Sequence, residues 1–304
     1  PDGERLAYSV VTNRSNIWRE KEPVTGAVSS RAAELVTTDQ ESIESFWISR
    51  DREWLVFDSD RSGTQQIFRR RLAGGEVQQI THGVSPAFSV SLSPDGKQVG
   101  YHSIVNGLRR VFVASSEGGD QPVQVSPGQF QDERNPQWSP DGERLAWSAI
   151  QDGVSRAQVV TRAARGWSAP REVASPGAAV GSTWGDTARL LAIDTVNLRL
   201  IGVSTDSSSS PPRVLFQATA ATPKGLAAPV ASTDFRMLYF ANRQGIWVMP
   251  IKGGALRELV RFDDPLHPHA TNARSVSGSA GFVYFTLQSP QSNIWIARVT
   301  GLTR

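Results

Sequence analysis

The sequence predicts an all-β fold: a single seven-bladed β-propeller over residues 1–304, built from four-stranded antiparallel blades. The first observation is the tripeptide Pro-Asp-Gly, which stands at residues 1–3, 94–96 and 140–142. The second is the short apolar strand that follows each copy, such as Arg144–Ser148. The third is the spacing, since a unit of about 40 to 50 residues is typical of stacked or radial repeats.

The same repeat unit, a turn followed by a short apolar strand, can be followed along the whole chain. It begins at residues 1, 50, 94, 140, 185, 233 and 278, which predicts seven units. The predicted blades cover approximately residues 1–38, 39–83, 84–128, 129–177, 178–220, 221–264 and 265–304. Six units keep the aspartate of the turn: Asp2, Asp51, Asp95, Asp141, Asp186 and Asp234. A short carboxylate in a β-turn accepts hydrogen bonds from backbone N–H groups two residues on, so we interpret these aspartates as structural turn residues.

Each unit reads as four short strands separated by Gly, Asn and Asp. In the third unit the strands are expected at residues 87–93, 98–103, 110–116 and 122–126. Period-two alternation supports them, and no segment has a convincing helical period. The chain opens after the first strand of unit one and stops after the third strand of unit seven. We therefore expect a strand upstream of residue 1 to close the ring.

Composition narrows the function classes. The chain has 32 Lys plus Arg against 29 Asp plus Glu, a net charge of +3, and no cysteine. So small an excess of positive charge predicts no nucleic-acid partner. No apolar stretch reaches the ~18 residues that a membrane span needs. The absence of cysteine excludes thiolate metal sites and a cysteine nucleophile. We expect a monomeric ring.

Two stretches carry a family resemblance. They are Trp138–Ser148, with its central Ser-Pro-Asp-Gly, and Asp58–Gly63, followed by Gln66–Phe68 and Ile80-Thr81. They resemble the repeat of the TolB-type, WD-repeat-like propellers. That family includes the periplasmic TolB protein, sensor propellers fused to kinases or DNA-binding regulators, propellers of prolyl-oligopeptidase-like enzymes, and oligogalacturonate lyases. The resemblance implies the propeller fold and favours an extracytoplasmic, periplasmic location.

Arginines mark one face of the predicted propeller. Six of the seven loops between the second and third strands contain one: Arg14, Arg61, Arg109, Arg156, Arg199 and Arg243. A ring of guanidinium groups is suited to bidentate capture of carboxylates or phosphates. The alternative is that a repeat copies a turn residue whose charge nearby aspartates neutralise, as in ordinary exposed ion pairs.

His267 and His269, next to Asp263 and Asp264, lie in an inter-blade connection on the same face. Imidazole and carboxylate groups can bind zinc, but the ligand number here is incomplete, so we predict a solvated loop and no metal or cofactor. Trp167, in a long loop between third and fourth strands, is the best candidate for an exposed aromatic anchor. Packing of Trp167 onto its own blade is the alternative.

No catalytic motif is found, and in particular no Gly-x-Ser-x-Gly. We therefore interpret the chain as a non-catalytic binding or sensing module of a larger protein. It would recognise a protein, a peptide or a small anionic ligand through the arginine-bearing face and the central channel. Two alternatives stay open: a metal-dependent propeller enzyme of the lyase or hydrolase-associated kind, and a polyanion binder whose affinity falls steeply with salt.

Overall fold

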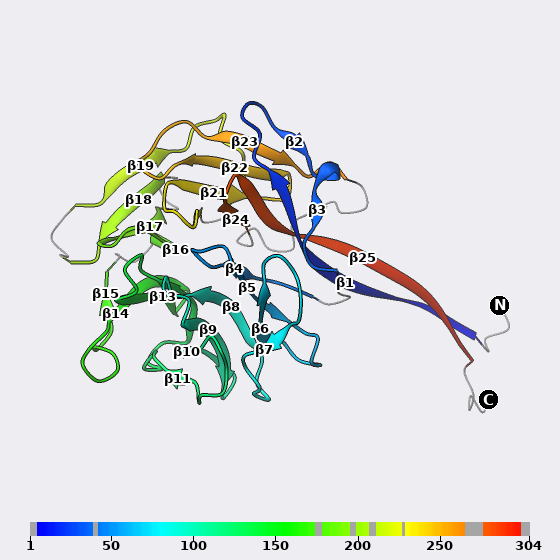
Figure 1. The fold of residues 1–304 in the computed structure, drawn as a ribbon, viewed down its shortest axis with the longest axis horizontal. Coiled ribbons are helices and arrows are strands. Elements are labelled where there is room, and N and C mark those ends of the chain that lie inside the picture. The colour runs from blue at the N-terminus through cyan, green and yellow to red at the C-terminus, as the bar shows by residue number, and fades with distance from the viewer. Residues whose placement is uncertain are drawn as a thin grey trace.

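The computed structural model describes residues 5–38, 42–173, 178–194, 199–206, 211–226, 229–264 and 276–298. These residues form six β-sheets arranged as the blades of a propeller (Figure 1). The described part of the chain holds one short 3-10 helix, Ser30–Ala32. None of its helices combines the length and apolarity needed to cross a membrane.

Blades I to III follow one another along the chain, and in each the strands pair in sequence order. Blade I comprises β4 (Phe46–Ile48), β5 (Trp54–Ser59), β6 (Gln66–Arg71) and β7 (Gln78–Gln79). Blade II comprises β8 (Ala87–Leu92), β9 (Gln98–Val105), β10 (Leu108–Ser115) and β11 (Val123–Gln124). Blade III comprises β12 (Asp132–Trp138), β13 (Arg144–Gln151), β14 (Val154–Thr161) and β15 (Arg171–Glu172).

Blades IV and V continue the pattern, and blade VI joins the two ends of the chain. Blade IV comprises β16 (Ala178–Asp186), β17 (Arg189–Asp194), β18 (Arg199–Ser204) and β19 (Arg213–Gln217). Blade V comprises β20 (Val230–Ala231), β21 (Met237–Ala241), β22 (Gly245–Pro250) and β23 (Arg257–Arg261), with β2 (Val28–Ser29) added at its outer edge. Blade VI comprises β24 (Val276–Ser279), β25 (Phe282–Arg298), β1 (Arg5–Lys21) and β3 (Glu34–Leu35).

The innermost strands form a closed ring. β4 contacts β8, β8 contacts β12, β12 contacts β16, β16 contacts β20, β20 contacts β24, and β24 returns to β4. Between each pair of neighbouring blades lies a cluster of buried apolar side chains, six clusters among the described residues. The core of a propeller is thus divided among its blade interfaces, so each blade depends on both of its neighbours.

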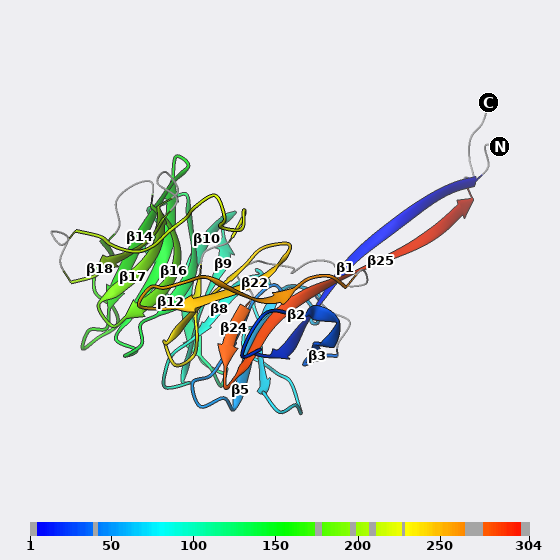
Figure 2. The ribbon, with the colours of Figure 1, turned by 90° about the horizontal axis from the view of Figure 1, so that it is seen from above.

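The prediction of seven blades is wrong: the chain forms six. The ranges 1–38 and 265–304, predicted as separate blades, contribute strands to one sheet. The expected closure by a strand upstream of residue 1 is also wrong, because β1 itself closes the ring by pairing antiparallel with β25, from Arg5 opposite Arg298 to Lys21 opposite Phe282. The two strands leave the body side by side as a long ribbon (Figures 1 and 2), with Arg5 opposite Arg298 at its far end.

The terminal segments differ from the regular blades because they have no turn between the second and third predicted strands. Between the second and third strands of blades II and III, the chain reverses at Asn106-Gly107 and Asp152-Gly153, all four with positive φ. The corresponding stretches 10–15 and 288–292 contain no glycine. Tight hairpin turns require residues that tolerate positive φ. In these stretches the chain does not reverse, so two predicted strands form the single 17-residue strand β1, and another two form β25.

A second connection fastens blade VI to blade V. The segment after β1 crosses the outer edge of blade V, where β2 pairs parallel with β23. The Ser29 hydroxyl donates to Asp263 at 2.5 Å, and the Arg257 guanidinium donates to the Pro23 carbonyl at 3.0 Å. The N-terminal segment therefore holds two blades formed from the far end of the chain.

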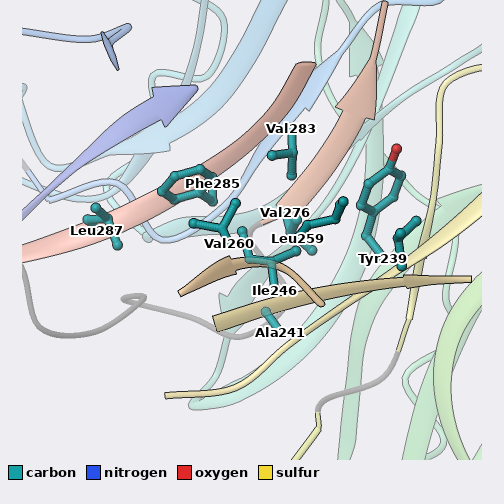
Figure 3. Close-up of a cluster of buried hydrophobic side chains, with 10 residues drawn as sticks. Tyr239, Ala241, Ile246, Leu259, Val260, Val276, Val283, Phe285 and Leu287 are labelled. Carbon is teal, nitrogen blue, oxygen red and sulfur yellow. The ribbon is translucent and has the colours of Figure 1, made fainter. Parts of the chain in front are cut away.

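Tyr239 and Gly278 meet at the interface between blades V and VI. The Tyr239 ring belongs to the apolar cluster of that interface, while its hydroxyl points away from the cluster (Figure 3) and donates to Glu22. Burial, reinforced by this bond, raises the pKa of Tyr239, so the hydroxyl keeps its proton. A Cβ at Gly278 would lie 2.0 Å from the Tyr239 ring, so only glycine leaves room for it.

We expect Gly278→Ala to lower the free energy of unfolding by about 1–3 kcal/mol, because the added methyl group displaces a buried ring. Urea denaturation measures the change. Gly83→Ala is the matched control, since Gly83 has no positive φ and its nearest contact would be 3.7 Å away. Equal stability of the two variants would contradict this packing.

Candidate functional site

The turns between first and second strands share one geometry, and the face that carries them is called the turn face. In blade III the Asp141 carboxylate accepts from the Ser139 hydroxyl at 2.5 Å and from the Glu143 N–H at 3.1 Å. The Ser139 hydroxyl in turn accepts from the Arg144 N–H at 2.9 Å. The same bonds recur around Asp51, Asp95 and Asp234. Asp186 accepts from the Ala188 N–H at 2.8 Å, and Asp2 lies outside the described residues.

Two of these turns place a large side chain where the regular copies have glycine. Gly96 and Gly142 adopt φ of 74° and 75°, and the equivalent residues are Arg52, with φ of 66°, and Phe235, with φ of 57°. A residue with a Cβ in this left-handed region costs roughly 1–2 kcal/mol. Such strain persists where the surrounding structure holds it and is concentrated at binding and catalytic sites. Both side chains line cavities of the turn face.

A cavity of about 550 Å³, called the seam pocket, lies where blades I, V and VI meet. Its walls come from the turns at 50–52, 232–237 and 278–281, together with Glu22. Three guanidinium groups (Arg50, Arg52, Arg236) face two carboxylates (Glu22, Asp234), which leaves positive charge in excess. Both carboxylates already accept hydrogen bonds, Glu22 from Tyr239 and Asp234 from its own turn.

Two further cavities lie on the turn face. The channel mouth, a narrow space of about 30 Å³, is lined by Trp47, Trp138 and Phe235, and it shares Arg50 and Thr233 with the seam pocket. Between blades II and III lies a pocket of about 420 Å³, lined by four carboxylates and two cations: Asp95, Asp120, Asp141, Glu143, Lys97 and Arg162. The guanidinium of Arg162 lies 5.1 Å from the Trp138 ring centroid and so connects this pocket to the channel mouth.

The sequence-predicted arginines lie toward the opposite face, called the loop face. Arg61 and Arg243 are in loops, Arg109, Arg156 and Arg199 are at the starts of third strands, and Arg14 is inside the continuous strand β1, so its predicted loop is wrong. Several already have partners. Arg109 pairs with Asp132 at 3.2 Å, Arg156 with Glu172 at 3.1 Å and Arg199 with Asp194 at 2.7 Å, while Arg61 lies over Phe57 and Phe68. Arg243 is exposed.

The remaining sequence candidates are His267, His269 and Trp167. His267 and His269 lie outside the described residues. Trp167 packs against its own blade: its ring centroid is 5.6 Å from that of Trp138, and Arg162 lies over both rings. Among the described residues, no group of three or more His, Cys, Asp or Glu is placed to hold a metal ion.

Two fully buried ionisable groups join blades rather than form a site. The Asp58 carboxylate of blade I accepts from the backbone N–H groups of Glu44, Ser45 and Ser89, the last from blade II. Burial raises the pKa of Asp58, and these hydrogen bonds act in the opposite direction. Glu133 of blade III lies 3.5 Å from Arg110 of blade II in a buried ion pair.

Sequence reasoning missed Arg50, Arg52 and Arg236. For Arg50 and Arg52 the signal was present, because Arg50-Asp51-Arg52 departs from Pro-Asp-Gly at the outer two positions and keeps the aspartate. Arg236 follows a second irregular copy, Thr233-Asp234-Phe235, but gives no such signal itself. Proline and glycine are the residues that fit the backbone of this turn best. A copy that keeps the turn without them carries other side chains at a conformational cost, which indicates that those side chains have a role of their own. Weighing each departure from the repeat would have pointed to this face.

Comparison with known proteins identifies the family. A model of the TolB beta propeller domain matches residues 1–187. The chain belongs to this family. The family resemblance seen in the repeat is therefore confirmed, and the remaining residues complete the same propeller.

Individual relatives are distant. An uncharacterized protein of Agrobacterium fabrum is 32% identical over 108 residues, which span 33% of this chain and only 37% of that protein. A TolB-like protein of Agrobacterium tumefaciens superposes with a TM-score of 0.69 at 17% identity, over 92% of this TolB-family chain and 100% of the other. TolB of Acinetobacter baumannii gives 0.58 at 15% identity, over 92% and 65%. A puromycin-hydrolyzing peptidase of Mycobacterium tuberculosis gives 0.57 at 19% identity, over 81% and 42%. These structures share the fold.

A buried histidine makes stability depend on pH. His102 stacks on Phe88, and burial, aided by the charges of Arg109 and Arg134, lowers its pKa to about 3. In the unfolded chain the imidazole of His102 binds a proton with a pKa of about 6.5. The contribution of neutral, buried His102 to the free energy of unfolding is therefore fully present above pH 6.5 and is lost as the pH falls toward 3. From pH 7 to pH 5 we expect the free energy of unfolding to fall by about 2 kcal/mol through this group.

His102→Phe should remove that part of the pH dependence while keeping an aromatic ring against Phe88. Urea denaturation of wild type and variant at pH 7 and pH 5 measures it. His82→Phe, at an exposed histidine, is the matched control and should keep the wild-type slope. An unchanged slope in His102→Phe would show that His102 is charged in the folded protein.

Proposed function

We propose that this TolB-family propeller is a recognition module rather than an enzyme, and that it binds an extended polypeptide segment across its turn face. The observation that carries the proposal is the continuity of cavities on that face: the seam pocket and the channel mouth share lining residues, and Arg162 connects the channel mouth to the pocket between blades II and III. An extended chain is long and narrow, and it needs a row of subsites rather than one deep cavity.

The chemistry of the row supports a polypeptide ligand. The channel mouth offers a small aromatic and apolar surface from Trp47, Trp138 and Phe235, against which an apolar side chain of the ligand can pack. The cavities on either side are lined by charged and hydroxyl groups that can pair with backbone and polar side chains. The TolB-family membership favours an extracytoplasmic setting for this role.

The blades hold this surface rigid. Four turns of the face, at Asp51, Asp95, Asp141 and Asp234, are closed by the Ser-x-Asp hydrogen bonds, and the strands behind the face pack through six apolar interfaces. A preformed surface loses little conformational entropy on binding, so the cost of ordering falls on the ligand alone. This favours a segment that is already extended or disordered in its parent protein.

A displayed library of random dodecapeptides, selected on the immobilised propeller, tests the proposal, with Kd measured by fluorescence anisotropy for synthetic copies of the selected peptides. Phe235→Gly removes the ring from the channel mouth and relieves its positive φ. We expect it to weaken binding about tenfold or more. Leu108→Gly, at a 43% exposed apolar residue of the loop face, is the matched control.

Peptides that bind equally well to wild type and Phe235→Gly, but are weakened by Leu108→Gly, would move the binding surface to the loop face. A library that yields no binder would overturn the proposal as a whole. Thermal unfolding of both variants establishes that each remains folded.

A further inference from the structure

We propose that the seam pocket is a carboxylate subsite, in which Arg50, Arg52 and Arg236 bind an acidic side chain or C-terminal carboxylate of the bound polypeptide. This inference rests on the proposed function and adds the chemical class of the ligand. It also places anion recognition on the turn face, opposite the arginines that the sequence indicated.

The charges of the pocket point to an anion. Three guanidinium groups line it, and the two carboxylates present are engaged with Tyr239 and with the turn of blade V. Arg50 and Arg52 are exposed at the pocket and have no ion-pair partner among the residues that the structure describes. Among the described residues, the one ion-pair contact of Arg236 is a long one of 3.8 Å to Asp234. Guanidinium groups arranged in this way offer several N–H donors to one carboxylate.

The loop face provides an internal comparison. There, Arg109, Arg156 and Arg199 are held by carboxylates at 3.2, 3.1 and 2.7 Å, and the guanidinium of Arg61 lies over two aromatic rings. A ligand anion would have to displace those partners. At the seam pocket it meets donors that are already exposed, so binding requires no exchange of ion pairs.

The backbone at Arg52 gives independent support. Arg52 adopts φ of 66° in a turn whose regular copies have glycine at the same place. Arg50 replaces the proline of those copies, so both departures from the repeat put a guanidinium into one cavity. The strained conformation is explained if the side chain of Arg52 is needed for binding, because glycine would fit the turn better.

The seam pocket is continuous with the channel mouth, which favours a polypeptide ligand over a free small anion. Arg50, Ser232 and Thr233 line both cavities. An extended segment that places an apolar side chain at the channel mouth therefore carries its next groups into the seam pocket. The pocket also spans blades I, V and VI, so an occupied pocket joins the two sides of the ring closure. Binding should raise the thermal unfolding temperature.

The deciding variant is Arg52→Gly, which removes a guanidinium and restores the residue that the turn prefers. We expect its Tm to equal or exceed that of the wild type, while its affinity for peptides carrying Glu or Asp beside the apolar anchor falls about tenfold. Replacing the acidic residue by Gln in the peptide should weaken binding to wild type by a similar factor and weaken binding to Arg52→Gly by a smaller factor, because Arg50 and Arg236 remain in that variant. Arg243→Gly, at an exposed loop-face arginine, is the matched control with wild-type affinity.

Charge reversal provides a second arm. Arg52→Glu should reject the acidic peptide and gain affinity for the same peptide with Lys in place of the acidic residue. Citrate alone is the small-molecule probe, and we expect it to compete only weakly. If citrate bound as tightly as the peptide, the inference that the bound carboxylate belongs to a polypeptide would be wrong.

The two proposals fail differently. If selected peptides bind and Phe235→Gly weakens them, but Arg52→Gly and the Gln peptide do not change affinity, the carboxylate subsite is overturned and the recognition role stands. If no peptide binds, both are overturned. Loss of binding in Arg52→Gly together with a lowered Tm would show a structural role for Arg52 and would also overturn the subsite.

Discussion

The antiparallel pairing of β1 with β25 is the constraint on which the rest of this propeller depends. It joins the first described strand to the last along 17 residue pairs and supplies two of the four strands of blade VI. The segment that follows β1 then adds β2 to blade V. Because each apolar interface needs a blade on both sides, the remaining interfaces are complete only when this closure has formed. Closure through the chain ends completes the radial arrangement, in which each blade has only short, protected edges within the ring.

The same closure creates the cavity of greatest interest. Blades I, V and VI are brought together by it, and their turns form the walls of the seam pocket. Glu22 takes part in both roles: its carboxylate accepts from Tyr239 in the interface and lines the pocket. A turn motif that is structural at Gly96 and Gly142 carries Arg52 at the seam. The repeat thus supplies a common frame, and departures from it supply the chemistry.

Most of the local structure could be predicted from the sequence. Strand positions in units two to six, the hairpin turns at glycine and the hydrogen bonding of the aspartates all follow from patterns within about ten residues. The seventh blade was predicted wrongly because the repeat frame was assumed to turn within stretches 10–15 and 288–292, where β1 and β25 instead continue without reversal. The loop-face arginines were visible as a pattern, but their ion pairs with Asp132, Glu172 and Asp194 depend on side-chain placement that spacing does not specify.

By itself, the sequence determined the four-stranded unit, its turns and the family, because these are set by short-range periodicity and by the backbone preferences of Gly, Pro and Asp. Only the tertiary structure decided the number of blades, the way the ring closes and the grouping of Arg50, Arg52 and Arg236 in one pocket. The physical reason is separation along the chain. The pairing of Arg5 with Arg298 and the meeting of residues 50 and 236 are long-range contacts, and no local pattern encodes their register.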